Sequence, residues 1–198
     1  MGRKSLKEVR QKEIIKAFYT VAKKEGVENT SIAKVAKHLE INPSLVLHYF
    51  TCRDEMIYYF VDFILERYSS IFMVDGENID TKEKVIALVD NLFSRKWNRY
   101  IDDGVFYTFY AQTFRDKKIK KVYKDLHDNL RRLLHQALTS ACANKVIHLE
   151  NINQTTDIIY VMVDGSYYYL SMFNNKETLN QWLENYRNYT LNLLGIER

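Results

Sequence analysis

The sequence predicts an all-α protein of nine helices. Only six glycines and one proline occur in 198 residues, whereas sheet-rich folds need many turns and use more of both. Apolar residues recur at three- and four-residue spacing along most of the chain, as they do on the buried face of a helix. A chain of this length, with 46% hydrophobic residues, buries a core without disulfide bonds.

The N-terminal quarter is predicted to hold three helices. The first has the apolar positions Ile14, Ala17, Phe18, Val21 and Ala22 and ends at Gly26, a residue favoured just after a helix. The second begins at Thr30 or Ser31, either of which can cap it. The third begins at Pro43 after the N-cap Asn42, since proline is well tolerated at the first helical position. Only about three residues then separate the second and third helices, which predicts a helix-turn-helix.

The third helix is short and has many large residues outside its core face. Val46 and Phe50 can face inward, which leaves a set of outer residues: Ser44, Leu45, Leu47, His48 and Tyr49. A core of its own does not explain such a helix, so we expect it to contact a partner.

Six longer segments follow. The fourth helix opens at Asp54-Glu55 and runs to Phe72, and the fifth runs from an expected cap at Asp80 through Trp97. An aromatic sixth helix is expected over 105–114, with Asp102-Asp103 as its turn and cap, and a seventh over 119–141. The eighth is expected over 155–173, and the ninth follows Asn174.

The charge is uneven along the chain. Residues 1–53 have 11 Lys and Arg against 5 Asp and Glu, whereas the other 145 residues have 18 against 20. A basic N-terminal quarter is expected if that quarter meets a polyanion, although a solvated basic surface would look the same.

Features that the sequence lacks limit where the protein is expected to work and which chemistry it can perform. Two cysteines, Cys52 and Cys142, argue against a disulfide scaffold and favour a reducing compartment. No secretory leader is visible, and the longest apolar run, 158–163, is too short to cross a bilayer. The histidines and cysteines have no zinc-ligand spacing, and no phosphate loop or catalytic motif occurs. We expect a cytoplasmic protein without catalytic residues, metal or cofactor.

The run from Thr30 to Phe50 resembles the DNA-binding signature of TetR-family transcriptional regulators. It shares the T-S-hydrophobic opening, the hydrophobic-Ala pair of the second helix and the His-Tyr-Phe ending of the third. Arg53-Asp54-Glu55-Met56 resembles the family's entry into the fourth helix, and the match covers 11–56. Asn42-Pro43-Ser44, Leu47-His48-Tyr49-Phe50 and Asp164-Gly165 are weakly similar to the choline-responsive BetI-like branch.

This resemblance implies a homodimeric repressor that a small-molecule effector releases from a palindromic operator in double-stranded DNA. It implies a DNA-binding domain at 1–53 and a helical effector-binding and dimerisation domain at 54–198. Two alternatives stay open: a DNA-binding regulator controlled by a protein partner without a small ligand, and a helical enzyme or scaffold that binds no DNA.

The family's DNA contacts can be carried over to matching positions. Base edges and nearby phosphates would be met by Ser44, Leu45, Leu47, His48 and Tyr49, and phosphates by Ser31, Lys34 and Arg53. His48 could instead be a packed core histidine, and Leu47 could pack against the first helix.

Three positions depart from the family pattern. Glu40 and Ser44 stand where the family usually has glycine, and Leu47 replaces a common tyrosine. A left-handed backbone at Glu40 would cost about 1–2 kcal/mol. The operator sequences of family members therefore cannot be assigned to this protein.

The resemblance also implies an effector cavity in the second domain. Its candidate lining residues are Trp97, Phe106, Tyr107, Tyr110, Phe114, Tyr160, Asp164 and Tyr168. Aromatic rings beside a carboxylate suit a cationic ligand, but a flat apolar compound or ordinary core and dimer packing would use the same residues. The last two helices would form the dimer as a four-helix bundle, with Gly165, Trp182, Leu183 and Tyr186 at the interface.

Overall fold

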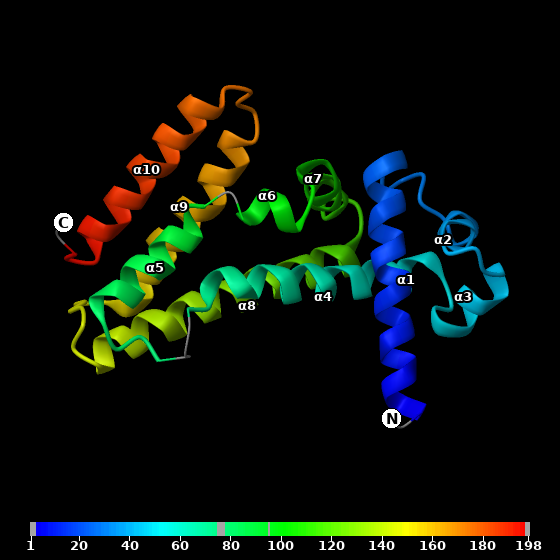
Figure 1. Ribbon diagram of the computed structural model, residues 1–198, viewed down its shortest axis with the longest axis horizontal. Coiled ribbons are helices and arrows are strands. Elements are labelled where there is room, and N and C mark those ends of the chain that lie inside the picture. Colours follow the sequence, from blue (N-terminus) through cyan, green and yellow to red (C-terminus); the bar gives the residue numbers. More distant parts are fainter. Residues whose placement is uncertain (1–2, 75–77, 95, 197–198) are drawn as a thin grey trace. The chain divides into compact units, whose positions relative to one another are not determined.

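The computed structural model describes residues 3–74, 78–94 and 96–196, which form helices and no strand (Figure 1). The all-α prediction is confirmed. The helices are α1 (Arg3–Glu25), α2 (Ile32–His38), α3 (Pro43–Tyr49), α4 (Arg53–Phe72), α5 (Lys82–Leu92), α6 (Lys96–Tyr100), α7 (Asp103–Gln112), α8 (Lys117–Ala143), α9 (Ile152–Leu170) and α10 (Lys176–Leu193). None of them, within the described ranges, is long and apolar enough to cross a membrane.

The predicted fifth helix is interrupted, so it appears as α5 and the short α6. Counted as one interrupted helix, the pair matches the nine-helix prediction. The interruption follows Leu92, whose carbonyl accepts a hydrogen bond at 3.0 Å from the indole nitrogen of Trp97. The expected cap at Asp80 was wrong: Thr81 caps α5 by accepting a hydrogen bond from the Lys84 amide, and Asp80 forms an ion pair with the Lys84 ammonium instead.

The chain packs as two compact units. The first comprises Met1–Glu66 and Ile101–Leu126, and the second comprises Arg67–Tyr100 and His127–Arg198. The division falls inside α4 and α8, so these packing units do not coincide with the functional division at residue 53, which stays a prediction.

The first unit contains α1, α2, α3 and α7 and the first parts of α4 and α8. α1 packs against α2, α3 and α7, and Val46 of α3 is completely buried. The rings of Phe18, Phe60 and Phe109 join α1, α4 and α7, with centroid separations of 5.5 and 5.2 Å. This core fixes α2 and α3 on one side of α1.

The second unit is built around α10, which packs against α5 and α9. Figure 1 shows α9 and α10 as an antiparallel pair joined by a short loop. Trp97 forms the centre of an aromatic cluster in this unit, with the rings of Tyr68, Phe72 and Tyr167 at 4.7, 5.7 and 5.2 Å from it.

Candidate functional site

The helix-turn-helix has the caps that the sequence predicts. Ser31 caps α2, since its hydroxyl oxygen accepts a hydrogen bond from the Lys34 amide at 3.3 Å. Asn42 caps α3 by accepting from the Ser44 amide at 2.9 Å, and Pro43 is the first residue of that helix. Both helix starts are therefore fixed by local hydrogen bonds.

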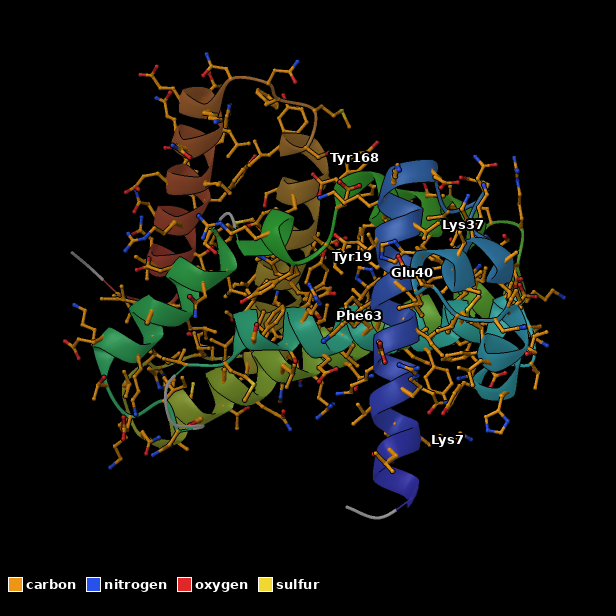
Figure 2. The ribbon with its side chains drawn as sticks, turned by 45° about the vertical axis from the view of Figure 1, so that its right-hand side comes forward. Lys7, Tyr19, Lys37, Glu40, Phe63 and Tyr168 are labelled. Atoms are coloured by element: carbon orange, nitrogen blue, oxygen red, sulfur yellow. The ribbon has the colours of Figure 1, made fainter. Side chains whose placement is uncertain are left out.

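The turn between α2 and α3 contains the strained residue that the resemblance pointed to. Glu40 has a φ of 55°. Its amide donates to the Lys37 carbonyl at 3.2 Å, and the Ile41 amide donates to the Ala36 carbonyl at 3.0 Å. This pair of bonds is the Schellman ending of a helix, in which the left-handed residue is usually glycine. Figure 2 labels Lys37 and Glu40 at this end of α2.

The outer face of α3 is available to a partner. His48 and Ser44 are exposed, and Leu47 has 46% of its surface exposed. Leu45 and Tyr49 are half-buried, with the Tyr49 ring edge-on to His48 at 5.1 Å. The core alternative for His48 is therefore removed, and its contact with a base stays a prediction.

The residues predicted to meet phosphates already have partners inside the chain. The Lys34 ammonium pairs with Glu25 at 2.7 Å. The Arg53 guanidinium donates from Nε to the Thr30 carbonyl at 2.7 Å and from Nη2 to the Val27 carbonyl at 2.5 Å. Arg53 thus clamps the turn between α1 and α2 to the start of α4.

Two basic features were missed from the sequence. Lys37 is exposed on α2, three residues after Lys34, and helical spacing could have found it. The first unit also contains a run of exposed cations at the start of α8: Arg115, Lys117, Lys118, Lys120, Lys121 and Lys124. Averaging the charge over all residues after 53 concealed this run.

The eight predicted effector residues are divided between the units. Phe106, Tyr107, Tyr110 and Phe114 belong to the first unit, and Trp97, Tyr160, Asp164 and Tyr168 belong to the second. In the first unit, Phe106 and Tyr110 lie against Tyr123 with ring centroids at 5.5 and 5.9 Å, and 74% of Phe114 is exposed.

In the second unit, Tyr160 and Asp164 lie beside His127. The Tyr160 hydroxyl is 2.7 Å from Nδ1 of His127, and an Asp164 carboxylate oxygen is 3.9 Å from the same nitrogen. Burial lowers the pKa of His127 although the carboxylates of Asp164 and Asp128 oppose it, and burial raises the pKa of Tyr160. Burial therefore favours the neutral imidazole, although the exposed carboxylate of Asp164 lies beside it.

The predicted interface residues differ in exposure. Trp182 is 39% exposed. Gly165 is also exposed, and a β-carbon placed there would meet no described atom within 4 Å. Tyr186 stacks between Trp182 and Phe93, whereas Leu183 is buried inside its own unit. Large apolar side chains are nevertheless exposed along α9 and α10, namely Ile158, Val161, Tyr168, Tyr169, Trp182, Tyr189 and Leu193.

The described residues contain no group of three or more His, Cys, Asp or Glu that could hold a metal ion. Among the pockets lined by described residues, two are of note. One of about 220 Å³ lies between α1 and α4 in the first unit. One of about 440 Å³ in the second unit is lined by Phe72, Ile79 and Leu133 among others. Neither pocket is lined by a predicted effector residue.

Comparison with known proteins gives a consistent result. The family model described as "Tetracyclin repressor-like, C-terminal domain" matches residues 80–196. The HTH-type transcriptional regulator BetI of Brucella abortus (strain 2308) is 24% identical over 166 residues, which are 81% of this chain and 83% of the relative. BetI of Brucella canis is 23% identical over the same shares.

Solved structures share the fold at low identity. A TetR transcription regulator from Haloarcula marismortui superposes with a TM-score of 0.78 at 18% identity, over 95% of this chain and 97% of that one. A putative transcriptional regulator from Saccharomonospora viridis, crystallised in complex with choline, superposes with a TM-score of 0.67 at 12% identity, over 92% and 97% of the two chains.

Proposed function

Because the chain belongs to the TetR family of DNA-binding transcriptional regulators, and is not an enzyme, we propose that it is a homodimeric repressor. It binds a palindromic operator in the cytoplasm and leaves it when a small-molecule effector binds. The observation that carries this proposal is the capped α2–turn–α3 element, whose second helix presents exposed His48, Ser44 and Leu47 beyond a buried Val46.

Two sets of residues recognise the operator, one by contacting base edges and the other by contacting phosphates. The face of α3 formed by Ser44, Leu45, Leu47, His48 and Tyr49 enters the major groove and reads base edges, because a helix of this size fits that groove. Ser31, Lys34 and Arg53 meet phosphates. Arg53 has five N–H groups and uses two of them inside the chain, so the others can reach an oxyanion.

Dimerisation uses α9 and α10. Their exposed apolar side chains, among them Val161, Trp182 and Tyr189, would lie in water in an isolated chain, and exposed large apolar side chains gathered on a helix pair are typical of an interface. Gly165 supports the same interface, since no described atom of its own chain lies within 4 Å of a β-carbon placed there, and glycine costs a helix about 1 kcal/mol. A two-fold dimer holds two reading heads about one helical turn of DNA apart, roughly 34 Å.

The effector is proposed to be a quaternary ammonium compound held in the second unit. Two observations support this class: the aromatic cluster around Trp97 and the exposed carboxylate of Asp164, since aromatic faces and a carboxylate both attract a cation. The Saccharomonospora viridis regulator crystallised with choline supports it too. Release then requires that the effector bind the DNA-free form more tightly, since equal affinity shifts nothing.

Selection of bound duplexes from a random pool tests the proposal. The selected DNA should contain a palindrome, and the logarithm of its affinity should fall with the logarithm of salt concentration by about 0.9 per neutralised phosphate. Choline should weaken binding to the wild type and have less effect on Asp164→Ala. A chain that binds no duplex at low salt would overturn DNA recognition. Salt-dependent binding insensitive to any small molecule would favour control by a protein partner.

A further inference from the structure

The pocket between α1 and α4 in the first unit has an apolar floor and an acidic rim. Ile15, Tyr59 and Phe63 form the floor. Figure 2 shows Phe63 of α4 beside Tyr19 of α1, and their ring centroids are 6.1 Å apart. The rim has three carboxylates, those of Glu8, Asp62 and Glu66, against the single ammonium of Lys12. The wall therefore favours a cation.

One wall residue is a buried hydrogen-bond acceptor without a donor. Gln11 is only 7% exposed and lines this pocket. Its amide nitrogen donates to the Tyr49 carbonyl at 3.4 Å. Because a carbonyl can only accept, this contact fixes the orientation of the amide, and Oε1 is the free oxygen. None of the described residues donates to it, and a buried acceptor without a donor is costly.

The carboxylate of Asp62 also lacks a cation within the described residues. The one ammonium in the wall, that of Lys12, pairs with Glu66 at 2.7 Å. Asp62 is exposed on one side, but the protein atoms around its carboxylate partly desolvate it, and this desolvation without a compensating positive charge raises the pKa of Asp62. A bound cation would supply the positive charge that the described residues do not place beside Asp62.

We propose that this pocket binds a small organic amine, whose protonated nitrogen donates to Asp62 and Gln11 while its apolar part packs on Ile15, Tyr59 and Phe63. The volume of about 220 Å³ lies below the roughly 300–1,000 Å³ typical of pockets for drug-sized ligands, so the ligand is small. Both groups accept hydrogen bonds, and a protonated amine offers N–H donors to the two of them together with a positive charge for Asp62. A quaternary ammonium compound has no N–H donor, which separates this ligand class from the effector proposed for the second unit.

The pocket lies behind the end of the candidate recognition helix. Gln11 holds the carbonyl of Tyr49, the last residue of α3. Tyr59 packs edge-on against Phe50, the residue that caps α3, with ring centroids 5.2 Å apart. An amine in the pocket therefore contacts the two side chains that fix this end of α3.

Calorimetric titration of the full chain with benzylamine tests the proposal. Benzyl alcohol, benzoate and benzyltrimethylammonium serve as matched probes, because they keep the ring and remove the charge, reverse it or remove the N–H donors. Benzylamine should bind, and the three matched probes should bind at least about tenfold more weakly, since a hydrogen bond to a charged group is worth about that factor or more. Equal binding of benzylamine and benzyl alcohol, or no binding of any probe, would overturn the proposal.

Variants locate the site. Asp62→Asn should lower benzylamine affinity by roughly 10- to 100-fold, and Gln11→Met, which keeps the side-chain size, should lower it less. Asp54→Asn is the matched control, because Asp54 is an exposed carboxylate on the same helix that does not line the pocket. Circular dichroism checks that each variant is folded. Loss of binding in Asp164→Asn with full binding in Asp62→Asn would assign the amine to the second unit and refute the site, while leaving the proposed function intact.

Discussion

Replacement of Glu40 by glycine should stabilise the protein. Glu40 occupies the left-handed position of a Schellman ending with a φ of 55°. A side chain at such a position costs about 1–2 kcal/mol. Glycine removes that cost, but it also loses roughly 0.4–1 kcal/mol because the unfolded chain gains freedom. The net expectation is a gain of about 0.5–1 kcal/mol, which for a chain of this size raises Tm by about 1–4 °C.

Urea unfolding followed by circular dichroism measures this change at a fixed protomer concentration, because dimerisation would otherwise shift the apparent stability. Glu40→Ala is the first control: it removes the carboxylate and keeps a β-carbon at positive φ, so it should gain little. Lys145→Gly is the second, since Lys145 has a φ of 57° and the same pair of bonds at the end of α8. It should gain a similar amount.

Gly195 provides an internal reference, because it occupies the same type of helix ending with a φ of 68°. A Glu40→Gly protein no more stable than Glu40→Ala would refute the assignment of strain to the backbone. If both variants gain equally, the carboxylate and not the β-carbon is the source of the cost.

Three further outcomes are expected. Arg53→Ala should lower the free energy of unfolding in urea by about 1–3 kcal/mol, because the Thr30 and Val27 carbonyls lose their donor. It should also make DNA affinity depend less steeply on salt concentration, and an unchanged slope would remove Arg53 from the phosphate contacts. His48→Ala should weaken the free energy of binding to the selected operator by about 1–3 kcal/mol and that to unrelated DNA by much less, as fluorescence anisotropy would measure. Equal losses on both DNAs would indicate that His48 packs or positions the helix and does not read a base. Trp182→Glu should give folded monomers in sedimentation, because a charge would enter the apolar face of α10; a variant that stays dimeric would exclude this interface.

Local chemistry made the helix-turn-helix predictable. The caps at Ser31 and Asn42 and the proline after Asn42 are short-range features that a sequence displays directly, and the structure has all three. The left-handed conformation of Glu40 was anticipated because Glu40 stands in the turn where the family usually has glycine. These residues interact only with neighbours in the sequence, so reasoning from the sequence reaches them.

Contacts between distant segments were not predictable in the same way. At the interruption after α5, the Leu92 carbonyl accepts hydrogen bonds from the Trp97 indole and from the Tyr167 hydroxyl of α9. The apolar spacing of Leu183 is the same whether it faces its own unit or a second chain, and in the structure it is buried within its own unit. Periodicity identifies the apolar face of a helix but not the partner that covers it.

The clamp made by Arg53 has an evolutionary consequence. One guanidinium ties together Val27, Thr30 and the start of α4 and is also proposed to touch the operator backbone. Lysine would keep the positive charge but offers no planar fork for two carbonyls at once. Variation at this position is therefore constrained twice, by folding and by regulation, whereas exposed Lys37 on the neighbouring helix forms no such clamp with carbonyls of the described residues. New DNA specificities in this lineage should arise around the clamp while the clamp itself persists.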